Sequence, residues 1–237
     1  LDQYGSRAGA EILIEVPGGQ AVAAKTYNPR LGISGGISIL GTSGIVEPMS
    51  EAALVDTIRA ELKVLRAAGN GPVLVTPGSY GENFSRDALG LRASRAVLCS
   101  NFVGETLDCA AVLGFEGVLL VGHLGKFVKL AGGMWNTHSK CGDCRMELIA
   151  AHAAALGLPP ARVEEVLDCA TCDDALRILK EEQLYDAVLA RLAERIEFHL
   201  AHKCGEMAAG AIVFSKEYGL LCRTSRAQEL LGTIMEG

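Results

Sequence analysis

Short, continuously apolar runs recur along this chain, and they constrain its fold more than any other feature. None of them shows the alternation of a strand that is half exposed. Uninterrupted apolar strands of this length are typical of parallel sheets covered by helices on both faces. The sequence therefore predicts an α/β fold with a mostly parallel sheet. The runs that predict strands are residues 37–40, 73–75, 96–99, 118–121, 212–214 and 220–222.

Amphipathic segments lie between these runs and predict helices. The first begins near Ser50, a good N-cap residue, and its apolar residues 54, 58, 62 and 65 share one face. Gly69 ends it. Further helices are predicted over residues 104–113, 143–156, 160–168, 172–182, 184–204 and 225–235.

The first 30 residues read differently. Residues 11–16 and 20–25 predict two strands of a hairpin, joined by a turn at residues 17–19. Because a lone hairpin is only marginally stable, we expect it to complete a sheet whose earlier strands are absent. Residues 1–30 are therefore interpreted as the end of a truncated N-terminal α+β domain, and residues 31–237 as the α/β domain.

Composition excludes several classes of protein. Of 237 residues, 49% are hydrophobic, which is enough for a sizeable core, and the net charge is −6. No run of Lys and Arg indicates nucleic-acid binding, and no apolar stretch reaches the roughly 18 residues of a membrane span. We expect a cytoplasmic protein, and a homo-oligomer is compatible with the sequence.

Polar turns follow the predicted strands, and this pattern predicts where ligands bind. Ligands of open α/β sheets lie at the carboxyl ends of the strands, where glycine permits close approach and helix N-termini attract anions. We expect the Gly-rich loop at residues 41–44 to bind a cofactor, although it lacks the dinucleotide fingerprint. The residues in these turns are Gly41, Thr42, Ser43, Gly44, Gly78, Ser100, Asn101 and His123.

Two C-x-x-C pairs raise the question of a metal site. They are Cys141 with Cys144 and Cys169 with Cys172, and such pairs are typical zinc ligands. The gap between them is longer than in zinc ribbons and holds an Ala-rich predicted helix. We therefore expect no protein-bound metal.

Four sequence blocks resemble the CbiD family. They are residues 28–50, 100–104, 122–133 and a last block comprising 137–139 with 143–147, and they follow the family order. The resemblance implies S-adenosylmethionine as methyl donor and cobalt-precorrin-5B as substrate, methylated at C-1 during anaerobic cobalamin (vitamin B12) biosynthesis. It also implies a Rossmann-like, three-layer C-terminal domain. The resemblance also implies a further N-terminal domain with a Thr/Gly-rich opening motif, and we do not find that motif in this sequence.

With this resemblance, the charged residues in the blocks become candidates for binding the substrate. The precorrin ring bears many acetate and propionate arms, so local cations are needed in an acidic protein. We expect Arg30, Lys126, Lys129 and Arg145, together with Thr137, to contact the substrate. Solvated surface charges are the alternative reading for each cation.

Methyl transfer from a sulfonium needs positioning and exclusion of water more than covalent chemistry. His123 and His138 are the catalytic candidates, because each could orient the ring or handle a proton. The strand-end residues Gly78, Ser100 and Asn101 join the Gly-rich loop as donor-binding candidates. Glu47 is predicted to contact the amino group of the donor.

Two other functions remain open from the sequence. One is a different nucleotide-cofactor enzyme, such as a dehydrogenase, on a similar sheet. The other is a non-catalytic module that binds a corrinoid or zinc. Measuring whether the protein binds S-adenosylmethionine or NAD distinguishes the methyltransferase from the first alternative. Binding of the precorrin ring without methylation would identify the second.

Overall fold

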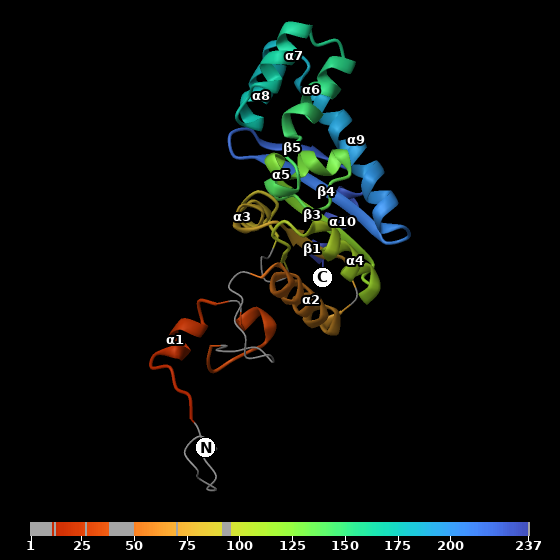
Figure 1. Ribbon diagram of the computed structural model, residues 1–237. Helices are drawn as coiled ribbons and strands as arrows, with labels where there is room; N and C mark the ends of the chain where they lie inside the picture. Colours follow the sequence, from red (N-terminus) through yellow and green to blue (C-terminus); the bar gives the residue numbers. More distant parts are fainter. Residues whose placement is uncertain are drawn as a thin grey trace. The chain divides into compact units, whose positions relative to one another are not determined.

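The computed structural model describes residues 11, 13–26, 28–37, 50–69, 71–91 and 96–236. The chain divides into two compact units, residues 1–48 and 49–237. Figure 1 shows the elements of both units coloured along the sequence.

The first unit contains a short helix where a strand was expected. Residues 13–16 have no regular secondary structure, and α1 spans Gly19–Ala23. Gly18 has a φ of 76°, which turns the chain into this helix. The expected hairpin of residues 11–16 and 20–25 is therefore wrong, because Ala-containing residues after a left-handed glycine favour a helical turn over an unpaired strand. A 3-10 helix, η2, follows at Asn28–Leu31.

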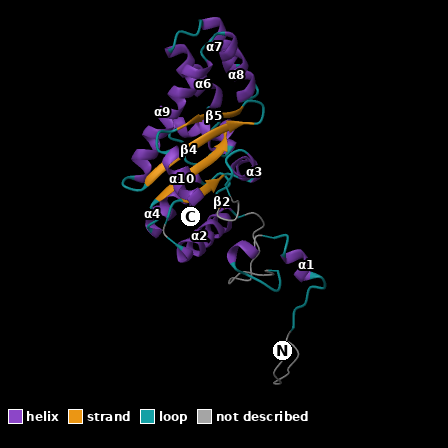
Figure 2. Cartoon of the chain, turned by 180° about the vertical axis from the view of Figure 1, so that it is seen from behind, coloured by secondary structure: helices purple, strands orange, loops and turns teal. Residues whose placement is uncertain are grey.

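The second unit is built on a five-stranded sheet in the part of the chain that the structure describes (Figure 2). The strand order is β2-β1-β3-β4-β5, and the first four strands are parallel, while β5 is antiparallel to β4. The prediction of an α/β fold with a mostly parallel sheet is confirmed. The strands are β1 (Val73–Thr76), β2 (Ala96–Leu98), β3 (Gly117–His123), β4 (Ala208–Ser215) and β5 (Gly219–Arg223).

Most of the helices of this unit lie where the apolar periodicity predicts them. Helix α2 begins after Ser50, whose hydroxyl accepts a hydrogen bond from the Ala53 amide at 3.5 Å. The helices that match predictions are α2 (Glu51–Ala68), α4 (Val103–Leu113), α6 (Arg145–Ala155), α7 (Pro160–Leu167), α8 (Cys172–Glu181), α9 (Tyr185–Cys204) and α10 (Ala227–Glu236). Helices α3 (Ser79–Asp87) and α5 (Leu124–Phe127), with 3-10 helices η4 (Val128–Gly132) and η5 (Ser139–Cys141), were not predicted.

Helices cover both faces of the sheet. On one face, strand residues such as Leu119 and Ile212 pack with α10 and with Phe84 of α3. On the other face, strand residues such as Val75 and Leu120 pack with α2, α4 and α9. Burial on both sides explains why β1, β3 and β4 are continuously apolar. Each buried Val, Leu or Ile stabilises the fold by about 1.5–3 kcal/mol.

Helices α6, α7 and α8 gather beyond the β5 edge of the sheet (Figure 1). The N-terminus of α8 is fixed by a capping box between Thr171 and Asp174. None of the described helices is both long and apolar enough to cross a membrane.

Candidate active site

The winding of the chain reverses direction between β1 and β3. The chain passes from β1 to β2 through α3, on one face, and from β2 to β3 through α4, on the other. Because β1 and β3 are neighbours in the sheet, their carboxyl ends flank the point where the two crossovers diverge. Ligands of open α/β sheets bind in the crevice at such a point.

A cavity of about 470 Å³ lies at this position. Its volume is within the usual range for sites that bind cofactors or small molecules. The ends of β1, β3 and β4 contribute to its wall, and the helices α6 and α8 complete it. The lining residues are Pro77, Gly78, Tyr80, His123, Gly125, Lys126, Arg145, Thr171, Cys172, Asp173 and Lys216.

Four of the residues predicted from the sequence meet in this cavity. They are Gly78, His123, Lys126 and Arg145, and they come from three different sequence segments. The structure thus brings a predicted donor-binding residue, a predicted catalytic residue and two predicted substrate-binding residues to one place.

Close packing of α3 positions its N-terminus at the cavity. A Cβ atom at Gly81 would lie 2.7 Å from the Val121 carbonyl oxygen, so a side chain there would push α3 away from β3. At the start of α3, Gly78 offers no side-chain cap. The amide groups of the first turn are thereby left for solvent or a ligand.

His123 ends β3 and caps the short helix α5. Its Nδ1 accepts a hydrogen bond from the Gly125 amide at 3.1 Å. Its ring packs edge-on against the Phe214 ring, and the two ring centroids are 5.7 Å apart. Burial lowers the pKa of His123, an effect that the charge of Asp173 opposes. The imidazole is therefore neutral near pH 7, with its proton on Nε2, where it can donate a hydrogen bond.

Lys126 links the cavity to the loop after β2. Its Nζ donates a hydrogen bond to the Ser100 carbonyl at 3.3 Å, and burial lowers its pKa. Ser100 has a φ of 53°, a conformation that non-glycine residues rarely adopt. Strained backbone of this kind is common where a loop is held for function.

Arg145 reaches the cavity from the start of α6. Its guanidinium forms a two-pronged ion pair with Asp143, at 2.6 and 2.8 Å, and this raises the pKa of Arg145. Its side chain remains 30% exposed, so further donors are accessible to a ligand carboxylate.

The other predicted residues of this unit lie outside the cavity wall. Lys129 is buried, and its Nζ donates to the carbonyls of Thr137 at 3.3 Å and Gly142 at 2.8 Å. The Thr137 amide donates to the Asn101 carbonyl at 3.0 Å. These contacts hold the loop that leads to α6, and the ligand-binding roles expected for Lys129, Thr137 and Asn101 stay predictions.

His138 is exposed and caps η5. Its Nδ1 accepts a hydrogen bond from the Lys140 amide at 3.0 Å, and it does not line the cavity. Its expected catalytic role also stays a prediction.

Several expected site residues cannot be placed. Gly41, Thr42, Ser43, Gly44 and Glu47 lie outside the described residues. Arg30 belongs to η2 in the first unit, and its side chain lies outside what the structure describes.

Sequence reasoning missed residues on the far wall of the cavity. Lys216 follows β4, and its Nζ lies 3.5 Å from the ring centroid of Tyr80; a hydrogen bond from Lys216 lowers the pKa of Tyr80. The strand-end rule applied to residues 212–214 could have found Lys216. No sequence pattern could have predicted Thr171 and Asp173, because only the folded chain brings the start of α8 to the cavity.

Among the described residues, no three His, Cys, Asp or Glu side chains are grouped so that they could hold a metal ion. Cys144 instead contacts the Met134 sulfur at 3.0 Å, and Cys169 lies 3.2 Å from the Glu165 carbonyl. Burial raises the pKa of Cys172 to about 11, so this thiol stays protonated at neutral pH.

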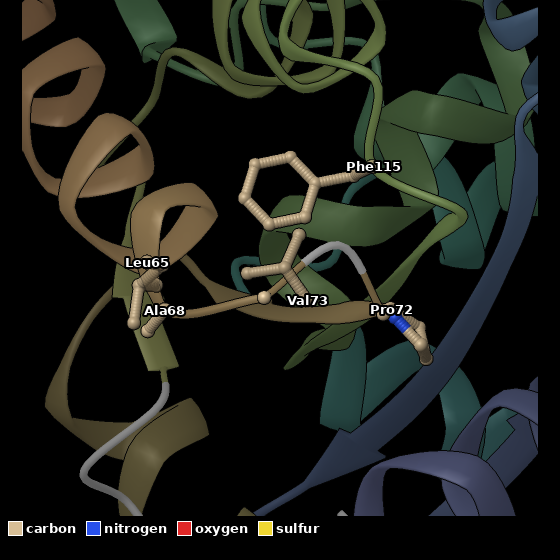
Figure 3. A pocket seen from close by; sticks show the side chains of 7 residues that line it. Leu65, Ala68, Pro72, Val73 and Phe115 are labelled. Carbon is tan, nitrogen blue, oxygen red and sulfur yellow. The ribbon is translucent and has the colours of Figure 1, made fainter.

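A second, smaller pocket lies at the opposite end of the sheet (Figure 3). Its volume is about 80 Å³, and side chains of Leu65, Ala68, Pro72, Val73 and Phe115 surround it. None of the described residues that line it is charged. It is a packing gap between α2 and the starts of β1 and β3.

Two family models match this chain, one in each of its two units. The family model described as "CbiD" matches residues 1–48, and the model described as "CbiD, C-terminal domain" matches residues 136–225. The second match includes Arg145, Asp173 and Lys216 of the cavity. No solved structure matches this chain.

Curated relatives named cobalt-precorrin-5B C(1)-methyltransferase align along most of the chain. The relative from Ruminiclostridium cellulolyticum is 45% identical over 212 residues, which are 90% of this chain and 55% of the relative. The relative from Alkaliphilus metalliredigens is 42% identical over 228 residues, or 96% of this chain and 60% of the relative.

A third relative, from Photorhabdus laumondii, is 41% identical over 233 residues, which are 97% of this chain and 62% of the relative. The chain thus spans little more than half the length of the relatives it matches. From both family models and these relatives, we conclude that the chain belongs to the CbiD family.

Proposed function

We propose that this chain provides the donor and substrate sites of a methyltransferase that uses S-adenosylmethionine to methylate C-1 of cobalt-precorrin-5B in anaerobic cobalamin biosynthesis. The observation behind this proposal is the strand-end cavity, where Gly78, His123, Lys126 and Arg145 meet. Membership of the CbiD family and the names of the relatives support the choice of reaction.

The charges of the cavity suit a ligand with carboxylate arms. Lys126, Arg145 and Lys216 line it, and the precorrin ring is a polycarboxylate. Arg145 can form paired hydrogen bonds with one arm, while each Lys acts as a point charge. We propose that these three cations hold arms of the ring beside the sheet.

The same cavity has features that fit the donor. The first turn of α3 leaves amide groups that suit a carboxylate, and one carboxylate oxygen of Asp173 is buried without a hydrogen-bond partner among the described residues. S-adenosylmethionine supplies a methyl group already activated by its sulfonium when bound. The task of the chain is therefore to align the acceptor carbon with this group and to exclude water.

His123 is proposed to orient the ring. Its Nδ1 is occupied by the Gly125 amide, so its Nε2 proton is available for a ligand acceptor. We also propose that residues 49–237 form the Rossmann-like domain of the family. The donor-binding roles expected for Gly41, Thr42, Ser43, Gly44 and Glu47 stay predictions.

Binding measurements on the chain test this proposal directly. Calorimetry should detect S-adenosylmethionine binding with a dissociation constant in the micromolar range and no binding of NAD. Arg145→Ala and Lys126→Ala should weaken binding of the cobalt-precorrin by roughly tenfold each, because each removes a charged hydrogen bond. NAD binding without donor binding would instead support a dehydrogenase.

Turnover is measured in parallel. Transfer of a labelled methyl group to cobalt-precorrin-5B is assayed under anaerobic conditions, with the Ruminiclostridium cellulolyticum relative as positive control. Because the chain spans only part of the relatives, donor binding is the decisive readout for the chain itself. A chain that binds the ring but neither binds nor is stabilised by the donor would be a corrinoid-binding module.

A further inference from the structure

Asp173 is the one acidic residue among the described residues that line the strand-end cavity. Three cationic residues, Lys126, Arg145 and Lys216, share the wall with it. Its Oδ1 atom is buried and has no hydrogen-bond partner among the described residues. A buried carboxylate oxygen without a partner is costly, so its position calls for an explanation.

Helix capping does not explain Asp173. At the start of α8, the Thr171 hydroxyl accepts a hydrogen bond from the Asp174 amide at 3.1 Å, and the Asp174 carboxylate accepts one from the Thr171 amide at 3.2 Å. The cap is thus completed by Asp174, the next residue. An acid in the first turn gains a little from the helix dipole, but that gain does not require a buried oxygen.

Ion pairing within the chain does not explain it either. No cationic side chain in the described part of the chain lies within ion-pair distance, 4.0 Å, of the Asp173 carboxylate. Its charge acts on His123 across the cavity without a hydrogen bond between them. The unpaired oxygen is therefore available to a donor group from outside the chain.

The chemistry of the two proposed ligands decides which of them supplies that group. Carboxylate arms of the precorrin ring would be repelled by Asp173 and attracted by the three cations. The methionine part of S-adenosylmethionine carries an ammonium and a carboxylate on one carbon. The acid Asp173 and the open first turn of α3 are together complementary to such a zwitterionic head.

We propose that Asp173 binds the ammonium group of the donor's methionine moiety, an inference that rests on the proposed function. The carboxylate of the same moiety lies at the first turn of α3. This assigns to Asp173 the amino-group contact that the sequence analysis gave to Glu47.

The test compares the binding of three ligands, the donor and two analogues of it, to matched variants. S-adenosylmethionine and S-adenosylhomocysteine both carry the ammonium, whereas 5′-methylthioadenosine keeps the nucleoside but lacks it. Asp173→Asn should weaken binding of the first two by roughly 10- to 100-fold and leave 5′-methylthioadenosine within about twofold, measured by calorimetry. The expected loss corresponds to one hydrogen bond between charged groups.

Two controls accompany this variant. Asp174→Asn removes the same charge from the neighbouring residue of the same helical turn; it should lower the melting temperature but leave all three affinities unchanged. Asp173→Ser, with its fold checked by circular dichroism, should reproduce the loss seen with Asp173→Asn.

The failures can be told apart. If the unaltered chain binds none of the three ligands, the proposed function itself is overturned. If it binds S-adenosylmethionine and Asp173→Asn binds it equally well, only the assignment of Asp173 is wrong. Equal weakening for 5′-methylthioadenosine would also overturn the ammonium contact, since Asp173 would then act on the nucleoside part of the ligand.

Discussion

The two ends of the sheet are built from the same strands but differ in character. At the amino ends of β1 and β3, apolar side chains enclose a gap of about 80 Å³ (Figure 3). At the carboxyl ends of the same strands lies a cavity of about 470 Å³ whose wall carries Lys126, Arg145, Asp173 and Lys216. The amino end serves packing, whereas the carboxyl end holds groups that packing alone does not require.

The contrast extends to local strain. Near the carboxyl end, Ser100 has a left-handed backbone and a carboxylate oxygen of Asp173 lacks a partner. At the other end, Phe115 is 6% exposed and belongs to the main core cluster. Unfavourable features of this kind persist where function compensates for them. The comparison predicts that stability and ligand binding respond to different ends of the sheet.

The largest effect is expected at the amino end. Phe115→Ala should lower the free energy of unfolding by about 3–5 kcal/mol, because it enlarges an existing gap beside Val73 and Leu65. Urea unfolding measures this, and calorimetry under folding conditions should find the affinity for S-adenosylmethionine unchanged. A marked loss of affinity in the folded variant would mean that the two ends are coupled.

Two lysines three residues apart, Lys126 and Lys129, are expected to have different roles near the carboxyl end of the sheet. Lys129→Met should lower the free energy of unfolding by about 2–4 kcal/mol, because it leaves the carbonyls of Thr137 and Gly142 without their buried donor. Lys126→Met should cost less than about 1 kcal/mol, since removing its partly desolvated charge offsets the lost bond to Ser100. Urea unfolding of both variants measures these two losses of stability. Equal losses would contradict different roles for Lys126 and Lys129.

A smaller effect is expected from pH. Burial lowers the pKa of His123 below its ordinary value of 6.5, so the unfolded chain binds the proton more tightly. The contribution of neutral His123 to the free energy of unfolding is therefore fully present above pH 6.5. It is lost as pH falls through the folded-state pKa of His123. His123→Gln should make the urea midpoint less dependent on pH in that window.

His152 and His199 also have lowered pKa values, with burial as the main cause. His152→Gln and His199→Gln are therefore run as controls, and each should remove only part of the remaining dependence. An unchanged pH profile in His123→Gln would show that His123 is not held neutral by the fold.

The smallest effect concerns Tyr80 at the rim of the cavity. A hydrogen bond from Lys216, aided by its charge, lowers the pKa of Tyr80. Lys216→Ala should move the ionisation of Tyr80 to higher pH with little change in stability, since both side chains are exposed. Ultraviolet titration follows this, and Tyr80→Phe identifies the tyrosine. An identical titration in Lys216→Ala would show that the pair does not form in solution.

The elements with strong periodicity were predictable from the sequence. Continuous apolar runs located the five described strands, and the stepping of residues 54, 58, 62 and 65 located α2. Helix α3 was missed because Ser79–Asp87 lacks an apolar stripe; it packs closely on β1 and β3 through Gly81. Helix α1 was mistaken for a strand because an isolated short apolar segment has no periodicity to decide between the two.

The site was predictable only in part, for a similar reason. The rule that ligands bind at strand ends located Gly78 and His123, because it depends on local sequence order. It could not separate Lys126 from Lys129, since their difference in exposure comes from the loop of residues 137–142 that folds over one of them. Asp173 required knowledge of how α8 packs against α6, α7 and α9.

The position of β4 has a consequence for how the cavity comes into being. This strand sits between β3 and β5, yet it follows α6, α7, α8 and α9 in the chain, and Lys216 comes directly after it. During synthesis, β1 and β3 emerge long before β4 can insert beside β3. A ribosome-bound intermediate would therefore lack the part of the cavity wall that follows β4, and ligand capture would report that β4 has taken its place beside β3.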